Sequence, residues 1–126
     1  MLIEDFIKKN FFHDSSLLVA EYNSHEGTLS VKISQSFSEL SIENQTGVKI
    51  TPDDIVEVDI LLEGIKHISK NMSLTEDNEI YDVIKGVIGE DDIIMIQLLI
   101  DRFYSEVYIR GNNITVKATI IGINSY

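Results

Sequence analysis

Two kinds of hydrophobic spacing follow one another at the start of the chain. Apolar residues recur at steps of three and four over residues 2–12, which is typical of a short amphipathic helix. Apolar and polar residues then alternate over 17–22 and again over 29–34, on either side of the polar segment 23–27, which ends in glycine. Two alternating runs around such a segment predict a β-hairpin over residues 16–34.

The segment 55–65 fits two interpretations. Some of its apolar residues lie three or four positions apart, and Thr51 and Pro52 are placed to begin a helix. Over 56–62, however, apolar residues occupy every second position and are rich in β-branched side chains. We favour a strand, and a helix stays the alternative.

Apolar β-branched runs dominate the second half of the chain. The spacing over residues 80–88 predicts a short helix that ends near Gly89. The run 93–100 predicts a buried strand. Two further runs flank the turn 111–113, and together they predict a closing hairpin over residues 104–123.

These elements predict a single domain over residues 1–126, because a chain of 126 residues is too short for two separate cores. Weaker strands are expected at 40–42 and 48–50, and a polar loop at 71–79. The predicted fold class is α+β and mainly antiparallel β. We expect a small sheet or sandwich, a short N-terminal helix and one further short helix.

The amino-acid composition indicates in which cellular compartment the protein is found. The chain has no cysteine, which excludes disulfides, thiolate metal ligands and cysteine nucleophiles, and favours a reducing environment. Glu4 and Asp5 lie where a secretion signal needs positive charge. The longest apolar segment, 93–100, is far shorter than the roughly 20 residues of a membrane-spanning helix. We therefore expect a cytosolic protein without a membrane partner.

Acidic residues dominate the charge. The chain has 21 acidic and 10 basic side chains, and residues 53–92 hold 12 of the acidic and 3 of the basic ones. Such a field repels nucleic acid and attracts basic proteins. An acidic surface that only keeps the protein in solution is the alternative interpretation. The charge predicts a basic protein partner on the 53–92 segment and no nucleic-acid partner.

A stripe of carboxylates follows if the segment after Pro52 is a strand. Alternation then places Glu57, Asp59 and Glu63 on one face, close in sequence to two further carboxylates. The predicted partner-binding residues are Asp53, Asp54, Glu57, Asp59 and Glu63. The stripe predicts a docking surface for a basic protein. An ordinary solvated strand face is the alternative.

No motif in the sequence carries recognisable chemistry. His13, Asp14 and Ser15 have the residue types of a nucleophilic triad, but three consecutive residues of an extended chain cannot converge. The scattered histidines lack the spacing of a metal site, and the acidic turns lack that of a calcium loop. We predict no catalytic residues, no metal site and no cofactor, and regard an enzyme as the least favoured class.

Both ends of the chain carry a family resemblance. Residues Phe12–Ser15, a strand, a turn and then Leu29–Ile33 resemble the opening of several families of small bacterial proteins that begin with F-H-D-S or F-H-D-G. The runs Glu106–Ile109 and Ile114–Ala118 are similar to the last hairpin of those families. Some of the families are uncharacterised, and others are grouped with immunity proteins of bacterial toxin systems. The resemblance implies a small α+β or mainly-β sandwich and an immunity function, and it carries over no active-site residues.

The leading hypothesis from the sequence is an acidic, non-catalytic protein-binding domain, namely an immunity-type inhibitor of a basic toxin. Electrostatic steering suits an inhibitor that must capture its target quickly. A generic interaction or oligomerisation domain is an alternative, which leaves a homo-oligomer open. A small-ligand-binding protein is a further one, and it requires a sizeable apolar pocket.

Overall fold

The computed structural model describes residues 1–69, 78–100 and 103–124. Most of the predicted polar loop 71–79 therefore lies outside the described residues. Within the described part, the chain forms one α-helix, one 3-10 helix and six strands. They are α1 (Ile3–Lys9), β1 (Ser15–Asn23), β2 (Thr28–Ser36), η1 (Phe37–Glu39), β3 (Ile55–Ile68), β4 (Asn78–Ile88), β5 (Asp91–Ile100) and β6 (Phe103–Ile123).

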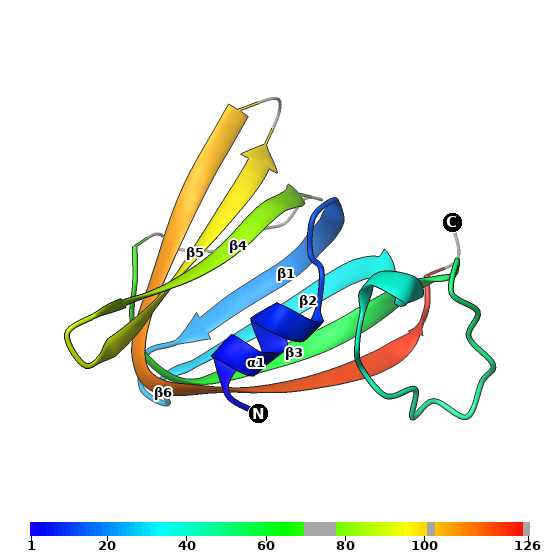
Figure 1. The fold of residues 1–126 in the computed structure, drawn as a ribbon, viewed down its shortest axis with the longest axis horizontal. Coiled ribbons are helices and arrows are strands. Elements are labelled where there is room, and N and C mark those ends of the chain that lie inside the picture. The colour runs from blue at the N-terminus through cyan, green and yellow to red at the C-terminus, as the bar shows by residue number, and fades with distance from the viewer. Residues whose placement is uncertain (70–77, 101–102, 125–126) are drawn as a thin grey trace.

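The strands form one closed sheet in the order β1-β2-β3-β6-β5-β4, with every neighbouring pair antiparallel (Figure 1). This confirms the predicted α+β, mainly antiparallel class with a short N-terminal helix. Among the described residues, a short stretch closes the barrel, in which Ser15, Ser16 and Leu17 of β1 pair with β4. The two strands diverge beyond this seam (Figure 1).

The predicted N-terminal hairpin is confirmed. Strands β1 and β2 pair in antiparallel register from Ser16–Ser34 to Asn23–Thr28. In the connecting turn, the side-chain oxygen of Asn23 accepts hydrogen bonds from the backbone N–H groups of His25 and Glu26, at 3.1 and 3.2 Å. A short polar side chain thus satisfies donors that the hairpin ladder leaves free.

The strand interpretation of residues 55–65 is also confirmed, since they lie within β3. Val56, Val58, Ile60 and Leu62 are buried in the core. The alternate residues of the strand therefore face outward. This strand pairs with β2 on one side and β6 on the other along most of its length.

The predicted helix over residues 80–88 is wrong, because this segment is strand β4. A β-bulge explains the error. Ile80 pairs with Leu98, whereas Asp82 pairs with Gln97, so the register shifts by one residue between them. The inward-facing residues Ile80 and Val83 are consequently three positions apart, which imitates helical spacing.

The predicted closing hairpin over residues 104–123 is also wrong. This segment is the single long strand β6, which curves strongly around the barrel (Figure 1). It pairs with β5 up to Gly111 and with β3 from Ile109 onward, so the two pairings overlap over three residues. The polar Asn112 and Asn113 follow this overlap, opposite the register shift between Glu63 and Ile65 of β3, and do not reverse the chain.

The predicted weak strands at 40–42 and 48–50 are wrong as well. The segment between η1 and β3 is irregular. Leu40, Ile42 and Ile50 are half-buried and pack against the core. Their hydrophobicity thus reflects packing of an irregular segment and not a ladder of backbone hydrogen bonds.

Helix α1 packs against the barrel and inserts two side chains into its core. Its Ile3 and Phe6 side chains are buried, and the Phe6 ring lies 5.5 Å from that of Phe12 between centroids. A small apolar hollow of about 60 Å³ lies between the helix and strands β2 to β5. The hydrophobic face expected over residues 2–12 therefore completes the core of the sheet.

A carboxylate joins three strands at the far end of the barrel. Asp91, at the start of β5, accepts from Lys66 of β3 at 2.9 Å and from Arg110 of β6 at 2.8 Å. Its side chain is only 14% exposed. The two cations lower the pKa of Asp91 below its ordinary value of 3.8.

Replacing Asp91 by asparagine is expected to lower the melting temperature by a few degrees at neutral pH. Because the folded-state pKa is lowered, the carboxylate stabilises the fold above pH 3.8, and this contribution is lost as the pH falls through the folded-state value. Thermal melts of both proteins from neutral pH to pH 2 should therefore converge in acid. The exposed neighbour Glu90 gives a control, since Glu90→Gln should change little at any pH. A difference between wild type and Asp91→Asn that persists in acid would contradict the assignment.

Candidate docking site on strand β3

The two carboxylates before β3 have different environments. Asp53 is exposed, whereas Asp54 is half-buried. The Asp54 side chain accepts a hydrogen bond from the backbone N–H of Thr51 at 2.8 Å, and its own N–H donates to the Thr51 carbonyl at 3.0 Å. Asp54 therefore shapes the turn that leads into β3, and Asp53 is the one available to a partner.

The other three predicted residues share the outer face of β3. We call Glu57, Asp59 and Glu63 the β3 carboxylates. Asp59 and Glu63 are exposed and Glu57 is half-buried, while Val58, Ile60 and Leu62 are buried in the core. None of the three forms an ion pair with another described residue. Their charges are thus held on one face and directed at solvent.

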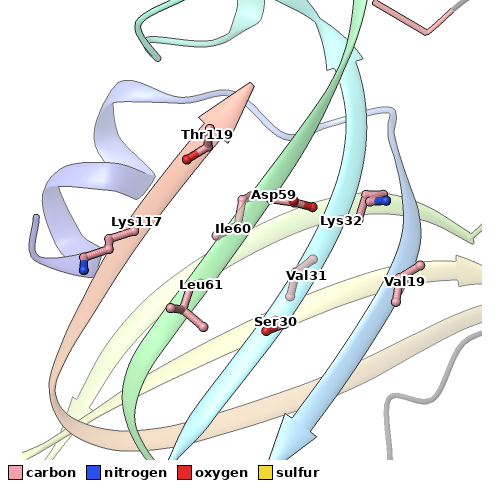
Figure 2. A pocket seen from close by; sticks show the side chains of 9 residues that line it. All are labelled: Val19, Ser30, Val31, Lys32, Asp59, Ile60, Leu61, Lys117 and Thr119. Carbon is pink, nitrogen blue, oxygen red and sulfur yellow. The ribbon is translucent and has the colours of Figure 1, made fainter. Parts of the chain in front are cut away.

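Neighbouring strands add two lysines to this face. Lys32 of β2 lies directly across from Asp59, and Lys117 of β6 lies across from Leu61. Figure 2 shows Asp59 and Lys32 on the adjacent strands β3 and β2, with the Lys32 amino group on the side of β2 away from Asp59. The stripe that is purely acidic along the sequence is therefore of mixed charge at its centre, and acidic at both ends.

A shallow hollow of about 470 Å³ lies at the centre of this face (Figure 2). Its lining residues come from four adjacent strands: Val19, Ser30, Val31, Lys32, Asp59, Ile60, Leu61, Lys117 and Thr119. The lining combines apolar side chains such as Val19 and Leu61 with the carboxylate of Asp59 and the ammonium groups of Lys32 and Lys117. Apolar and charged groups of both signs therefore lie side by side in this hollow.

Several other basic side chains already have acidic partners within the chain. Lys66 and Arg110 bind Asp91, as described above, and Lys85 lies 3.3 Å from Asp92. Lys85 also approaches Glu4 of α1 at 3.9 Å. These internal pairs neutralise the acids at the start of β5, whereas the β3 carboxylates have no ion pair within the described residues and only Lys32 and Lys117 as cationic neighbours on their face.

The His13-Asp14-Ser15 segment lies at the β1–β4 seam. The His13 Nε2 atom is 3.3 Å from an Asp14 oxygen, but the Ser15 hydroxyl is buried and donates to the Phe12 carbonyl at 2.6 Å. A hydrogen bond between His13 Nδ1 and the Tyr81 carbonyl raises the histidine pKa above 6.5. The three residues therefore connect the seam and do not form a nucleophile–base pair.

Glu79 of β4 joins the same group. Its carboxyl shares a hydrogen bond with that of Asp14, and this contact raises the pKa of Glu79. Within the described ranges, no three histidine, aspartate or glutamate side chains are grouped so that they could hold a metal ion. No helix in the described part of the chain has the length and apolar character needed to cross a membrane.

Comparisons of this chain with protein-family models, with curated proteins and with solved structures gave no match.

Proposed function

We propose that the protein is a non-catalytic, cytosolic binding domain that captures a basic protein, as an immunity-type inhibitor captures a basic toxin. One observation carries the proposal: the β3 carboxylates share an exposed strand face and have no ion-pair partner among the described residues. Carboxylates held in this way attract a basic partner before contact, which raises the rate of encounter.

The cavities favour a protein partner over a small ligand. Ligand pockets usually measure about 300–1,000 Å³ and enclose most of the ligand. The interior hollow measures only about 60 Å³, and the hollow of about 470 Å³ is an open depression on the sheet surface. A shallow surface with apolar and charged groups side by side suits a protein interface better.

The triple substitution Glu57→Lys, Asp59→Lys and Glu63→Lys tests this proposal. The protein encoded by the neighbouring gene is the candidate partner to be tested. At low salt we expect association with that protein to slow by about tenfold or more, because steering depends on these charges. Stopped-flow association at several salt concentrations gives the measurement, and added salt should slow the wild type in the same way.

A matched control separates docking from net charge. Glu39, Glu43 and Glu90 are exposed and lie outside the outer face of β3, so their triple lysine substitution changes the net charge by the same amount. It should slow association much less. Since Asp59→Lys places a lysine across from Lys32, a second triple variant with glutamine or asparagine keeps the test valid if the first folds poorly. Equal rates for the β3 and control variants would contradict the proposal.

A further inference from the structure

The outer face of β4, β5 and β6 is apolar and open to solvent. Cross-strand pairing places Ile84, Met95 and Tyr108 in one row and Leu99 and Tyr104 in another. Ile84 is 48% exposed, Tyr104 58% and Tyr108 43%. Strand β5 is therefore apolar on both sides, with only the inward side covered by the core. Large uncovered apolar patches of this kind mark binding surfaces.

An aromatic row extends this face across the β1–β4 seam. The centroids of consecutive rings are 5.8 Å apart for Phe11 and His13, 5.1 Å for His13 and Tyr81, and 5.1 Å for Tyr81 and Tyr104. The contacts are tilted or edge-on, which are arrangements that aromatic pairs prefer. Residues from the segment before β1, from β4 and from β6 thus meet in one continuous surface.

Carboxylates are interspersed with these rings. Asp82, Gln97 and Glu106 form the cross-strand row between the tyrosine rows, and Glu106 accepts the Tyr108 hydroxyl at 2.6 Å. The pKa of His13 is raised first by its hydrogen bond to the Tyr81 carbonyl and then by the nearby carboxylates of Asp14, Glu79 and Asp82. Arg110, at the end of the same face, is already bound to Asp91. The face therefore complements positive charge.

We propose that this surface, the tyrosine face, docks an arginine-bearing segment of a partner protein. It consists of Tyr81, Asp82, Ile84, Met95, Leu99, Tyr104, Glu106 and Tyr108. The flat face of a guanidinium group can stack on a tyrosine ring while its N–H groups, which lie in the guanidinium plane, donate to a carboxylate. Aromatic residues and arginines also contribute most of the binding energy at many interfaces. A second copy of this chain is disfavoured, because each copy carries a net charge of −11.

This face lies on other strands than the β3 carboxylates, so the inference does not depend on the function proposed above. The test uses ¹⁵N-labelled protein titrated with a short arginine–glycine peptide, and in parallel with a lysine–glycine peptide of equal charge. We expect the arginine peptide to shift the amide signals of 79–84, 95–99 and 104–108 and to bind more tightly than the lysine peptide. Shifts confined to β2 and β3 would overturn the proposal.

Two single variants test whether the rings of Tyr104 and Tyr108 contact the arginine peptide. Tyr104→Ser and Tyr108→Ser should each weaken binding of the arginine peptide by about three- to fivefold, since each removes one cation–π contact. The triple lysine variant of the β3 carboxylates should retain the shifts on the tyrosine face. Equal binding of both peptides with no effect of either tyrosine variant would overturn the proposal. So would concentration-dependent shifts on this face without peptide, because they would assign it to a second copy.

Discussion

Replacing Gly111 with alanine is expected to destabilise the fold by about 3 kcal/mol, the upper part of the range for overpacking. A Cβ atom at this position would lie 2.2 Å from the backbone oxygen of Gly64 and 2.9 Å from the Ile114 side chain. The first contact is with backbone, so β3 and β6 would have to separate at the bend. Urea unfolding at equilibrium measures the loss directly.

Gly86 provides the control for this prediction. It also lies within a strand, but a Cβ atom there would meet nothing within 4 Å, and its φ is not positive. Gly86→Ala should therefore leave stability unchanged or raise it by about 0.5 kcal/mol, because alanine restricts the unfolded chain. Similar losses for the two variants would show that the close approach of β3 and β6 is not what Gly111 provides.

The bend at Gly111 connects the two candidate surfaces. Before the bend, β6 contributes Tyr104 and Tyr108 to the tyrosine face. After the bend, it contributes Lys117 and Thr119 to the face that carries the β3 carboxylates. Because one strand serves both faces, its curvature sets the angle between them. A partner large enough to contact both would depend on that angle.

The sequence pattern predicted correctly those elements whose structure depends mainly on neighbouring residues in the chain. The hairpin over residues 16–34 follows from alternation and a turn rich in polar residues, and both are visible within a short window. The strand β3 follows from alternation over 56–62, which also predicted correctly that Glu57, Asp59 and Glu63 share a face. For these elements local and tertiary preferences agree.

The failures arise where tertiary pairing changes the local pattern. A bulge between Ile80 and Asp82 shifts the phase of β4, and no local signal in the sequence separates this from a helix. The residues Gly111–Asn113 have turn composition, yet they form a bend, because β6 exchanges β5 for β3 as its partner at that point. Such an exchange depends on contacts distant in sequence.

The same limit applies to the candidate surfaces. The lysines that interrupt the β3 carboxylates come from β2 and β6, so only the strand order could reveal them. The tyrosine face unites Tyr81 with Tyr104, which a predicted helix over 80–88 and a predicted hairpin over 104–123 had assigned to separate elements. Its only trace in the sequence is the run 93–100, which is apolar on both faces of a strand.

Truncating Phe6 to alanine is expected to cause the largest loss of stability, about 3–5 kcal/mol. Phe6 is only 5% exposed and borders the small apolar hollow inside the barrel. Removing the ring enlarges this hollow, and the surrounding strands can close around it only in part. Urea unfolding should therefore show a lower midpoint with little change in slope.

Phe11 is the matched control, since the same residue type lies five positions later and is 54% exposed. Phe11→Ala should change stability by no more than about 0.5 kcal/mol.

The Phe6→Ala variant should also bind a small apolar ligand, because a dry apolar cavity can hold a molecule such as benzene. Benzene should then raise the melting temperature of Phe6→Ala and leave the wild type unchanged. Equal losses for the two phenylalanine variants, with no benzene effect, would mean that the Phe6 ring does not fill space in the barrel core.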